Sequence, residues 1–254
     1  MTGLDILAWV AFPYAAAAIF LAGHIFRYRY DQFGWTSRSS QSYESWLLAW
    51  GSPLFHYGML GVIAGHVVGL LIPREWLYAI GVDEHLYHLG ATWIGTLVAV
   101  ITIVGLVLLL ARRGAVRRVL RVTSTMDVVM YLVLAASIIT GTIAVVQFQV
   151  LGEGYDYRGT VSPWVRSLIL LQPEVSLMAG VPLMFQLHVL SSTLLFAIWP
   201  FTRLVHVLSV PVGYLFRPYI VYRSRDDHRG ARAPRRGWQP SSRPERTPQR
   251  AGRR

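Results

Sequence analysis

Four histidines lie within two strongly apolar segments of this 254-residue chain. His56 and His66 are ten residues apart in one segment, and His188 and His206 are eighteen residues apart in the other. Eighteen residues make five turns of an α-helix, so His188 and His206 would leave one helix face about 27 Å apart along the axis. The rise between His56 and His66 would be about 15 Å. Imidazole is costly in lipid unless it is paired or binds something, so these side chains need partners.

The segments that must position these histidines are long enough to cross a membrane. The chain is 54% hydrophobic, with a mean hydropathy of +0.41, which is too apolar for a soluble domain. A spanning helix needs about 20 apolar residues. Five segments reach that length, namely Leu4–Phe26, Trp46–Ile72, Leu86–Ala111, Met126–Val150 and Val181–Leu208. We therefore predict an all-α integral membrane protein with five transmembrane helices.

The distribution of arginine predicts the orientation of these helices. Arginine collects in the loops after the first and third segments, at positions 27, 29, 38, 112, 113, 117, 118 and 121. The loops after the second and fourth segments have Arg74, Arg158 and Arg166, which six acidic residues offset. Positive charge favours the cytoplasmic side. The N-terminus is therefore predicted outside and the C-terminus in the cytoplasm. The first segment is too long for a cleaved signal peptide, and it has Asp5 where such a peptide has a basic start. We therefore interpret it as a membrane span.

The composition also limits the chemistry and divides the chain into two regions. Cysteine is absent, which excludes thiolate metal sites, iron–sulfur clusters, covalently attached haem and disulfides within this chain. Thirteen of the 24 arginines lie from Arg203 onward. Residues 223–254 have almost no apolar content, so we predict a disordered cytoplasmic tail there and a membrane domain over residues 1–222. We interpret this charge as favouring anionic lipid or a protein partner over nucleic acid.

The antiparallel course of the second and fifth helices pairs the histidines by membrane level. His56 would lie level with His206 near the cytoplasm, and His66 nearer His188. Two facing pairs of neutral imidazoles suit the axial ligation of two b-type haems. The unequal rises require tilted haem planes and a bend at Pro200.

A less specific interpretation remains open for each of these features. A single histidine in a membrane helix is commonly a hydrogen-bonded packing residue, and the Gly61–Gly65–Gly69 spacing is also that of a helix-packing ridge. We interpret His24, at the cytoplasmic end of the first helix, as an interfacial residue or a substitute ligand. His228 falls in the tail.

Three stretches of the sequence are the most specific, namely RYRYDQFGWTSRSSQ (27–41), SPLFHYGMLGVIAGHVVGLLIP (52–73) and FQLHVLSSTLLFAIWPFTRLVHVLSVPVGYLFRPY (185–219), and PFTRLVHVLSVPVGYL is the most specific phrase. Together they resemble the γ subunit (cytochrome b) of respiratory nitrate reductase. The resemblance runs from Pro13 to Tyr222. It implies five helices that hold a proximal haem b on His56 and His206 and a distal haem b on His66 and His188.

The resemblance also implies a function and partners. Members of this family lie in the plasma membrane of prokaryotes and oxidise menaquinol or ubiquinol at the outer side. They pass electrons inward to an iron–sulfur β subunit and a molybdenum-containing α subunit, which reduces nitrate to nitrite. Some members have a lysine in the outer loop after the second helix, and this chain has His85 near that position. No nitrate chemistry is expected on this chain itself.

Further residues are candidates for the quinol and haem sites. Gly65 and His66 lie at the predicted depth of a quinol site, where His85 or His88 could accept a proton, unless both loop histidines are merely interfacial. Three arginines at the level of the proximal haem could bind its propionates or simply be positive-inside residues, namely Arg112, Arg113 and Arg203. We expect a short amphipathic piece at Pro163–Leu171, around Trp164. Docking of a partner is expected at Tyr214–Tyr222 and the basic tail.

Two other functions remain possible from the sequence. One is the dihaem subunit of another quinone-linked oxidoreductase, such as a formate dehydrogenase. The other is a haem-free transporter or structural anchor, in which the histidines pack or relay protons.

Overall fold

The five predicted membrane spans are present as five long helical stretches. The computed structural model describes residues 2–35, 40, 42–43, 45–152, 154–209 and 216. Within these residues there is no strand, and five helices are long and apolar enough to cross a membrane, over Gly3–Tyr30, Trp46–Leu71, Glu84–Ala115, Thr125–Val150 and Leu183–Phe201. The predicted all-α, five-helix fold is confirmed. The tail and most of the predicted docking segment lie outside the described residues.

Several of the spans combine an α-helix with a π-helical or 3₁₀ turn. The spans comprise α1 (Gly3–Ile6), η1 (Leu7–Ala11) and α2 (Phe12–Tyr30); α3 (Trp46–His66) and η3 (Val67–Leu71); α5 (Glu84–Ala115); α7 (Thr125–Ala144) and η4 (Val145–Val150); and α9 (Leu183–Ile198) and η6 (Trp199–Phe201). The connections contain η2 (Gln32–Gly34), α4 (Arg74–Ala79), α6 (Arg117–Arg121), α8 (Val161–Ile169) and η5 (Val175–Met178), and η7 (Arg203–Ser209) follows the last span.

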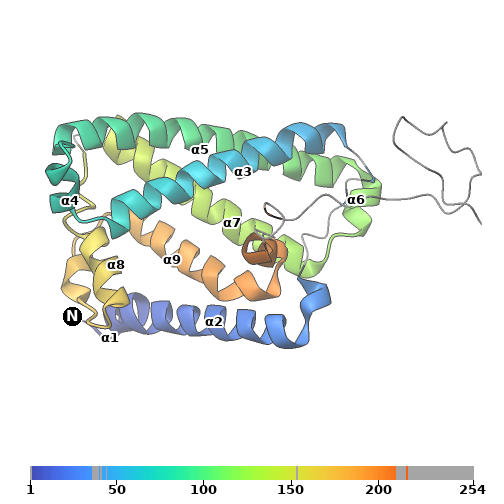
Figure 1. Ribbon diagram of the computed structural model, residues 1–254, viewed down its shortest axis with the longest axis horizontal. Coiled ribbons are helices and arrows are strands. Elements are labelled where there is room, and N and C mark those ends of the chain that lie inside the picture. Colours follow the sequence, from blue (N-terminus) through green and yellow to red (C-terminus); the bar gives the residue numbers. More distant parts are fainter. Residues whose placement is uncertain are drawn as a thin grey trace, which may run out of the picture. The chain divides into compact units, whose positions relative to one another are not determined.

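The connections alternate between the two ends of the bundle. Figure 1 shows α3 and α5 along one side, α2 along the opposite side, and α7 and α9 between them. The N-terminus, α4 and α8 lie at one end, which we call the α8 end, and α6 lies at the other, the α6 end. The main helix contacts are α3 with α5, α7 with α9, and α2 with α9. This arrangement matches the alternation of arginine-rich and arginine-poor loops, and the end that faces the cytoplasm stays a prediction.

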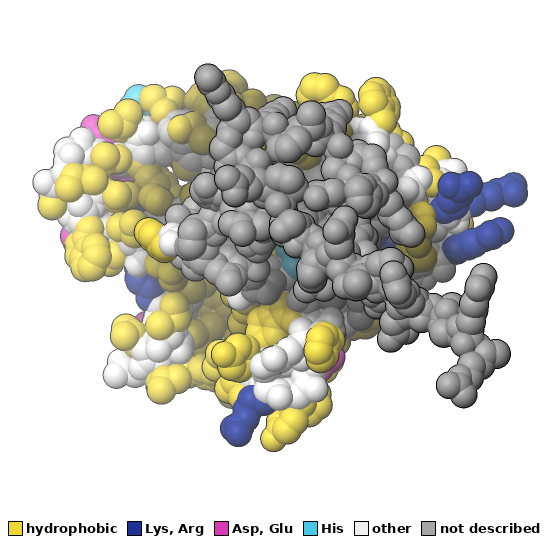
Figure 2. Space-filling model, turned by 45° about the vertical axis from the view of Figure 1, so that its right-hand side comes forward, with side chains coloured by type: hydrophobic (Ala, Val, Ile, Leu, Met, Phe, Trp, Pro, Cys, Tyr) yellow, Lys and Arg dark blue, Asp and Glu magenta, His cyan; other side chains and the backbone are white. Residues whose placement is uncertain are grey.

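The surface of the bundle is largely apolar. Large hydrophobic side chains are exposed along the spans, among them Trp93 at 65% and Leu132 at 67%. Figure 2 shows such side chains in yellow over one face of the molecule, with arginine side chains projecting beyond them. Lipid tails are the environment in which an apolar helix surface of this kind is stable.

Glycines bring α3 and α5 into close contact. A Cβ atom at Gly105 would lie 2.3 Å from the backbone nitrogen of Phe55, and one at Gly58 would lie 2.4 Å from the Thr102 hydroxyl. A Cβ at Gly61 would also meet α5, at 2.7 Å from Val98. Small residues at these positions allow two helix backbones to approach closely. Gly65 differs, because nothing lies within 4 Å of a Cβ added there.

The fifth span is not one continuous helix to Leu208, as the sequence had suggested. α9 ends at Ile198, Trp199–Phe201 forms a 3₁₀ turn, and Thr202 is extended at φ −111° and ψ 177° before η7 begins. Pro200 was predicted to bend the helix, and the helix breaks there. The expectation that His188 and His206 project from one helix face, five turns apart, is therefore wrong.

At the α8 end, α8 holds the end of the second span. Ser162 donates to the Gly69 carbonyl at 2.7 Å, and Arg166 donates to the Leu70 carbonyl at 3.1 Å. The predicted Pro163–Leu171 piece is thus a helix over Val161–Ile169. Trp164 is only 3% exposed and its indole donates to the Trp9 carbonyl, so this side chain points inward and not toward lipid.

Candidate functional site: two histidine pairs

The structure brings the four apolar-segment histidines together as two pairs. His56 of α3 faces His206 of η7 with ring centres 6.0 Å apart. His66, at the end of α3, faces His188 of α9 with ring centres 5.8 Å apart. The partners are those that the antiparallel topology predicted. Their roles as ligands stay a prediction.

All four imidazoles have the same hydrogen bond at Nδ1. Each Nδ1 lies 2.6–2.8 Å from a backbone carbonyl oxygen, and the carbonyls are those of Ser52 for His56, Val62 for His66, Ser137 for His188 and Arg203 for His206. A carbonyl oxygen only accepts, so Nδ1 carries the proton of each neutral ring. The lone pair then lies on Nε2, which is the arrangement found in metal-ligating histidines.

The spacing within each pair fits a metal held between two imidazoles. Two metal–nitrogen bonds of about 2 Å each, with the two half-rings behind them, place the ring centres about 6 Å apart. In the described part of the chain, no group of three or more His, Asp or Glu side chains could hold a metal ion. A pair of histidines suits an iron whose four other ligands come from a macrocycle, as in haem. The residues present therefore fit haem b.

The helix packing around His188 places a glycine of α7 directly against the imidazole ring. A Cβ atom at Gly141 of α7 would lie 2.8 Å from both Cε1 and Nδ1 of His188. The carbonyl that accepts from His188 belongs to Ser137, one turn earlier on α7. Regular helix packing between α7 and α9 thus sets the position of this imidazole.

The surroundings of His206 are different, because the ring projects from a seven-residue 3₁₀ helix. Arg203, three residues earlier, forms a salt bridge with Asp127 of α7. Trp35, just beyond η2, donates from its indole nitrogen to the Val205 carbonyl at 2.6 Å. Side-chain contacts from two other elements thus hold the segment that contains His206. Neither Asp127 nor Trp35 was predicted from the sequence as a site residue.

The predicted quinol residues have contrasting environments at the α8 end. His66 and Gly65 are exposed, and the space beside Gly65 is open. His85 is exposed at the start of α5, whereas His88 is half-buried and its Nε2 lies 2.8 Å from the Gln149 side-chain oxygen. His88 therefore donates from Nε2 and connects α5 to η4. His85 is the loop histidine with the greater access to solvent.

A tyrosine pair near this end was also not foreseen. The hydroxyls of Tyr87 and Tyr157 lie 2.6 Å apart, and the Arg158 guanidinium lies 4.1 Å from the centre of the Tyr87 ring. Burial raises the pKa of the Tyr157 hydroxyl above its usual range, and the neighbouring Tyr87 adds to this shift. The Tyr157 hydroxyl is therefore protonated at neutral pH. Both hydroxyls pack against Gly69, where an added Cβ would lie 2.9 Å from the Tyr87 oxygen.

The three arginines proposed for the propionates all contact protein groups. Arg112, 3% exposed, donates to the Ser40 hydroxyl and carbonyl at 2.9 and 2.8 Å. Arg113, 8% exposed, donates to the Thr123 hydroxyl at 2.7 Å. Arg203 forms a salt bridge with Asp127 of α7. Their binding of propionates stays a prediction.

His24 is buried within the protein, at 8% exposed. Its interpretation as a residue at the membrane interface stays a prediction. Its Nδ1 lies 2.7 Å from the Phe20 carbonyl, and its ring lies 4.3 Å from that of Phe20. Nε2 has no hydrogen-bond partner among the described residues. His228 lies outside them.

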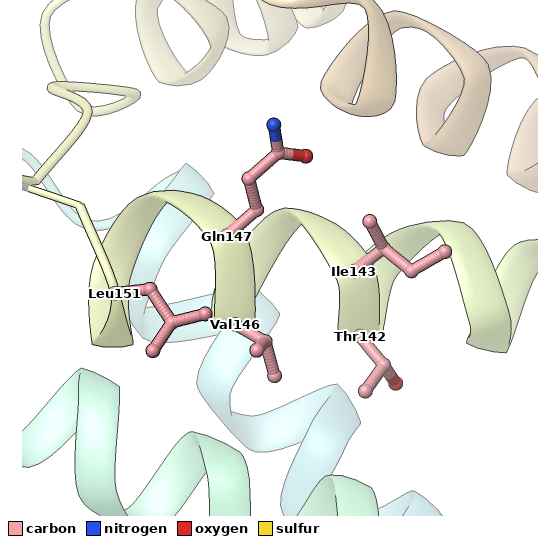
Figure 3. A pocket seen from close by; sticks show the side chains of 5 residues that line it. All are labelled: Thr142, Ile143, Val146, Gln147 and Leu151. Atoms are coloured by element: carbon pink, nitrogen blue, oxygen red, sulfur yellow. The ribbon is translucent and has the colours of Figure 1, made fainter.

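A shallow cavity of about 320 Å³ lies along the last turns of the fourth span. Its lining is mainly apolar and comprises Thr142, Ile143, Val146, Gln147 and Leu151. Figure 3 shows Gln147 and Ile143 on one side of the helix and Thr142 and Val146 on the other. It contains none of the paired histidines.

Residues 5–225 match the family model described as "Nitrate reductase gamma subunit". The chain belongs to the nitrate reductase gamma subunit family. Among its relatives, the nitrate reductase gamma chain of Bacillus subtilis is 43% identical over 219 residues, which cover 86% of this chain and 98% of the relative. The respiratory nitrate reductase 1 gamma chain of Escherichia coli is 33% identical over 226 residues, or 89% of this chain and all of the relative.

A longer relative matches over only part of its length. The nitrate reductase-like protein NarX of Mycobacterium tuberculosis is 51% identical over 233 residues, which cover 91% of this chain. The chain spans 36% of the length of that relative. The gamma-subunit family thus accounts for this chain over nearly all of the residues that form its helices.

Proposed function

We propose that this chain is the dihaem cytochrome b subunit of a respiratory nitrate reductase. In this role it oxidises quinol in the membrane and supplies electrons to partner subunits that reduce nitrate to nitrite. The observation that carries the proposal is the double pairing of histidines. Both pairs have ring centres about 6 Å apart, and each ring has a backbone carbonyl at Nδ1.

We assign the proximal haem b to His56 and His206 and the distal haem b to His66 and His188. A bound haem supplies reversible one-electron chemistry. The protein's part is to keep the proton of each ring on Nδ1, so that Nε2 is unprotonated, and the four carbonyl contacts at Nδ1 support this.

We place the quinol site at the exposed face of Gly65 and His66, at the α8 end. Open space beside Gly65 would admit a flat aromatic ring from the lipid. Oxidation of menaquinol or ubiquinol also releases protons that a nearby base must accept. His85 suits this role better than His88, because it is exposed and the His88 Nε2 already donates to Gln149. The α8 end therefore faces outward in this proposal, and the C-terminus is cytoplasmic.

Electrons leave at the α6 end into an iron–sulfur β subunit, and they continue from there to a molybdenum-containing α subunit. This chain has no cysteine, so it has no iron–sulfur cluster of its own to continue the relay. Arg112 and Arg113 are buried cations at the α6 end, and a propionate is the type of group that a buried guanidinium favours. The tail from Arg223 onward is the proposed contribution of the C-terminus to docking.

The optical spectrum of the purified protein tests this proposal. We expect reduced b-type bands and two haems per chain. Replacing His66 or His188 with alanine should remove one haem, and replacing His56 or His206 should remove the other. Loss of different haems within one pair would contradict the pairing, and a wild-type protein without haem would contradict the proposed function. His85→Ala should slow quinol oxidation and leave the haem content unchanged.

A further inference from the structure

A buried carboxylate of α7, Asp127, has no role in the function proposed above. It is 1% exposed and lies in the first turn of the helix. Its two oxygens accept from Nε and a terminal nitrogen of Arg203 at 2.8 and 2.9 Å. This is the two-bond fork by which a carboxylate fixes both the position and the plane of a guanidinium.

The local sequence fixes the direction of this carboxylate. Ser124 caps α7 by accepting from the Asp127 backbone nitrogen, and the Asp127 side chain accepts in return from the Ser124 backbone nitrogen at 3.0 Å. This reciprocal capping box ties the side chain to the start of a membrane span. The carboxylate therefore lies on a rigid element.

Arg203 connects this carboxylate to one of the paired histidines. The Arg203 carbonyl accepts from His206 Nδ1 at 2.6 Å, so a chain of hydrogen bonds runs from α7 through Arg203 to the imidazole. His206 lies in a short 3₁₀ helix after the break at Thr202, and such helices have weaker internal hydrogen bonds than α-helices. The position of this segment, and with it the carbonyl that binds the ring, therefore depends on contacts from outside the segment.

We infer that Asp127 is a positioning residue for His206. It holds Arg203, and through the Arg203 carbonyl it sets the plane of the imidazole that faces His56. Among the described residues the distal pair has no equivalent, because His188 donates directly to a carbonyl of α7. This inference rests on the proposed function, in which His56 and His206 hold the proximal haem.

The test compares the two haems of purified full-length protein with Asp127→Asn. Low-temperature electron paramagnetic resonance reports the angle between the two imidazole planes of each haem. We expect a shifted signal for the proximal haem or its loss, from two haems per chain to one, with the distal signal unchanged. Arg203→Lys keeps the charge but removes the fork, and should shift the same signal.

A control variant removes an ion pair at the opposite end. Asp156 forms a salt bridge with Arg74 at the α8 end, and Asp156→Asn should leave the proximal signal unchanged. Unchanged proximal signals in Asp127→Asn and Arg203→Lys would overturn the inference. A parallel decrease of both haems in these variants would also overturn it, because it would indicate a role only in folding. If Asp127→Asn does not fold, the proximal signal of Arg203→Lys decides whether the inference holds.

Wild-type protein measured beside the variants keeps the two hypotheses apart. Two wild-type haems with an unaltered proximal signal in the variants would leave the proposed function intact and reject the positioning role. Wild-type protein without haem would reject both.

Discussion

The two histidine pairs are similar in spacing but are held in place in different ways. His188 lies on a regular helix, against a glycine and a backbone carbonyl of α7. His206 lies on a short 3₁₀ helix that is fixed by the side chains of Asp127 and Trp35. Backbone packing therefore sets one pair, and side-chain hydrogen bonds and charge set the other. The pairs should differ in which substitutions disturb them.

The largest effect is expected where a single change disturbs both pairs. In Gly105→Ala, the new Cβ would lie 2.3 Å from the backbone of Phe55, next to His56, so α3 and α5 must separate. Overpacking of this kind destabilises by about 1–3 kcal/mol. We expect a lower thermal midpoint and less of both haems, measured in detergent. Gly95→Ala on the same helix has open space and is the control, and an equal effect in both variants would contradict the prediction.

The second-largest effect should occur in one histidine pair and not in the other. Gly141→Ala places a Cβ 2.8 Å from the His188 ring, and α7 cannot move away without disturbing its contact with α9. We expect the distal haem to be lost and the proximal haem to be kept, so that haem content falls by half. Redox titration of the remaining haem identifies it. A variant that keeps the distal haem would contradict the prediction, because it would show that α7 can shift to make room for the added Cβ atom.

A smaller effect is expected from Trp35, whose indole holds the segment that contains His206. Trp35→Phe keeps an aromatic ring against His24 but removes the hydrogen bond to the Val205 carbonyl, worth about 0.5–1.5 kcal/mol. We expect both haems to remain and only the proximal paramagnetic signal to shift. Trp164→Phe loses a similar bond at the α8 end and is the matched control. The prediction fails if the control shifts the proximal signal as much.

The smallest effect concerns a hydroxyl pair beside His188. The side chains of Ser137 and Ser192 lie 2.7 Å apart, whereas His188 contacts the backbone oxygen of Ser137. Ser192→Ala should therefore change stability by no more than about 1 kcal/mol and leave the distal signal unaltered. A clear change of that signal would mean that side chains control this pair too, and would remove the contrast between the two pairs.

The sequence alone predicted the spans and the pairing partners. Apolar length is enough to locate a spanning helix, and an antiparallel course is enough to match His56 with His206. It could not predict the break at Thr202, because Pro200 is compatible with either a kink or a termination. The break also explains how two unequal spacings along the chain produce two pairs with nearly equal ring distances.

Other features of the site depend on contacts between distant residues. Asp127 and Arg203 are 76 residues apart, and nothing in the local sequence predicts that they meet. The Ser124–Asp127 spacing does indicate a helix start, so the position of the carboxylate was detectable but its partner was not. The burial of His24 likewise depends on Trp35, whose ring centre lies 5.8 Å from that of His24.

The contact between α8 and the second span has a consequence for the order of biosynthesis. Ser162 is translated 93 residues after Gly69, whose carbonyl it will satisfy, and Arg166 is translated 96 residues after Leu70. Until the ribosome has made α8, these carbonyls must be satisfied by water or lipid headgroups. The helix end next to His66 is therefore completed only once the fourth span has been synthesised. We expect the distal haem to be inserted late, into a nearly finished chain.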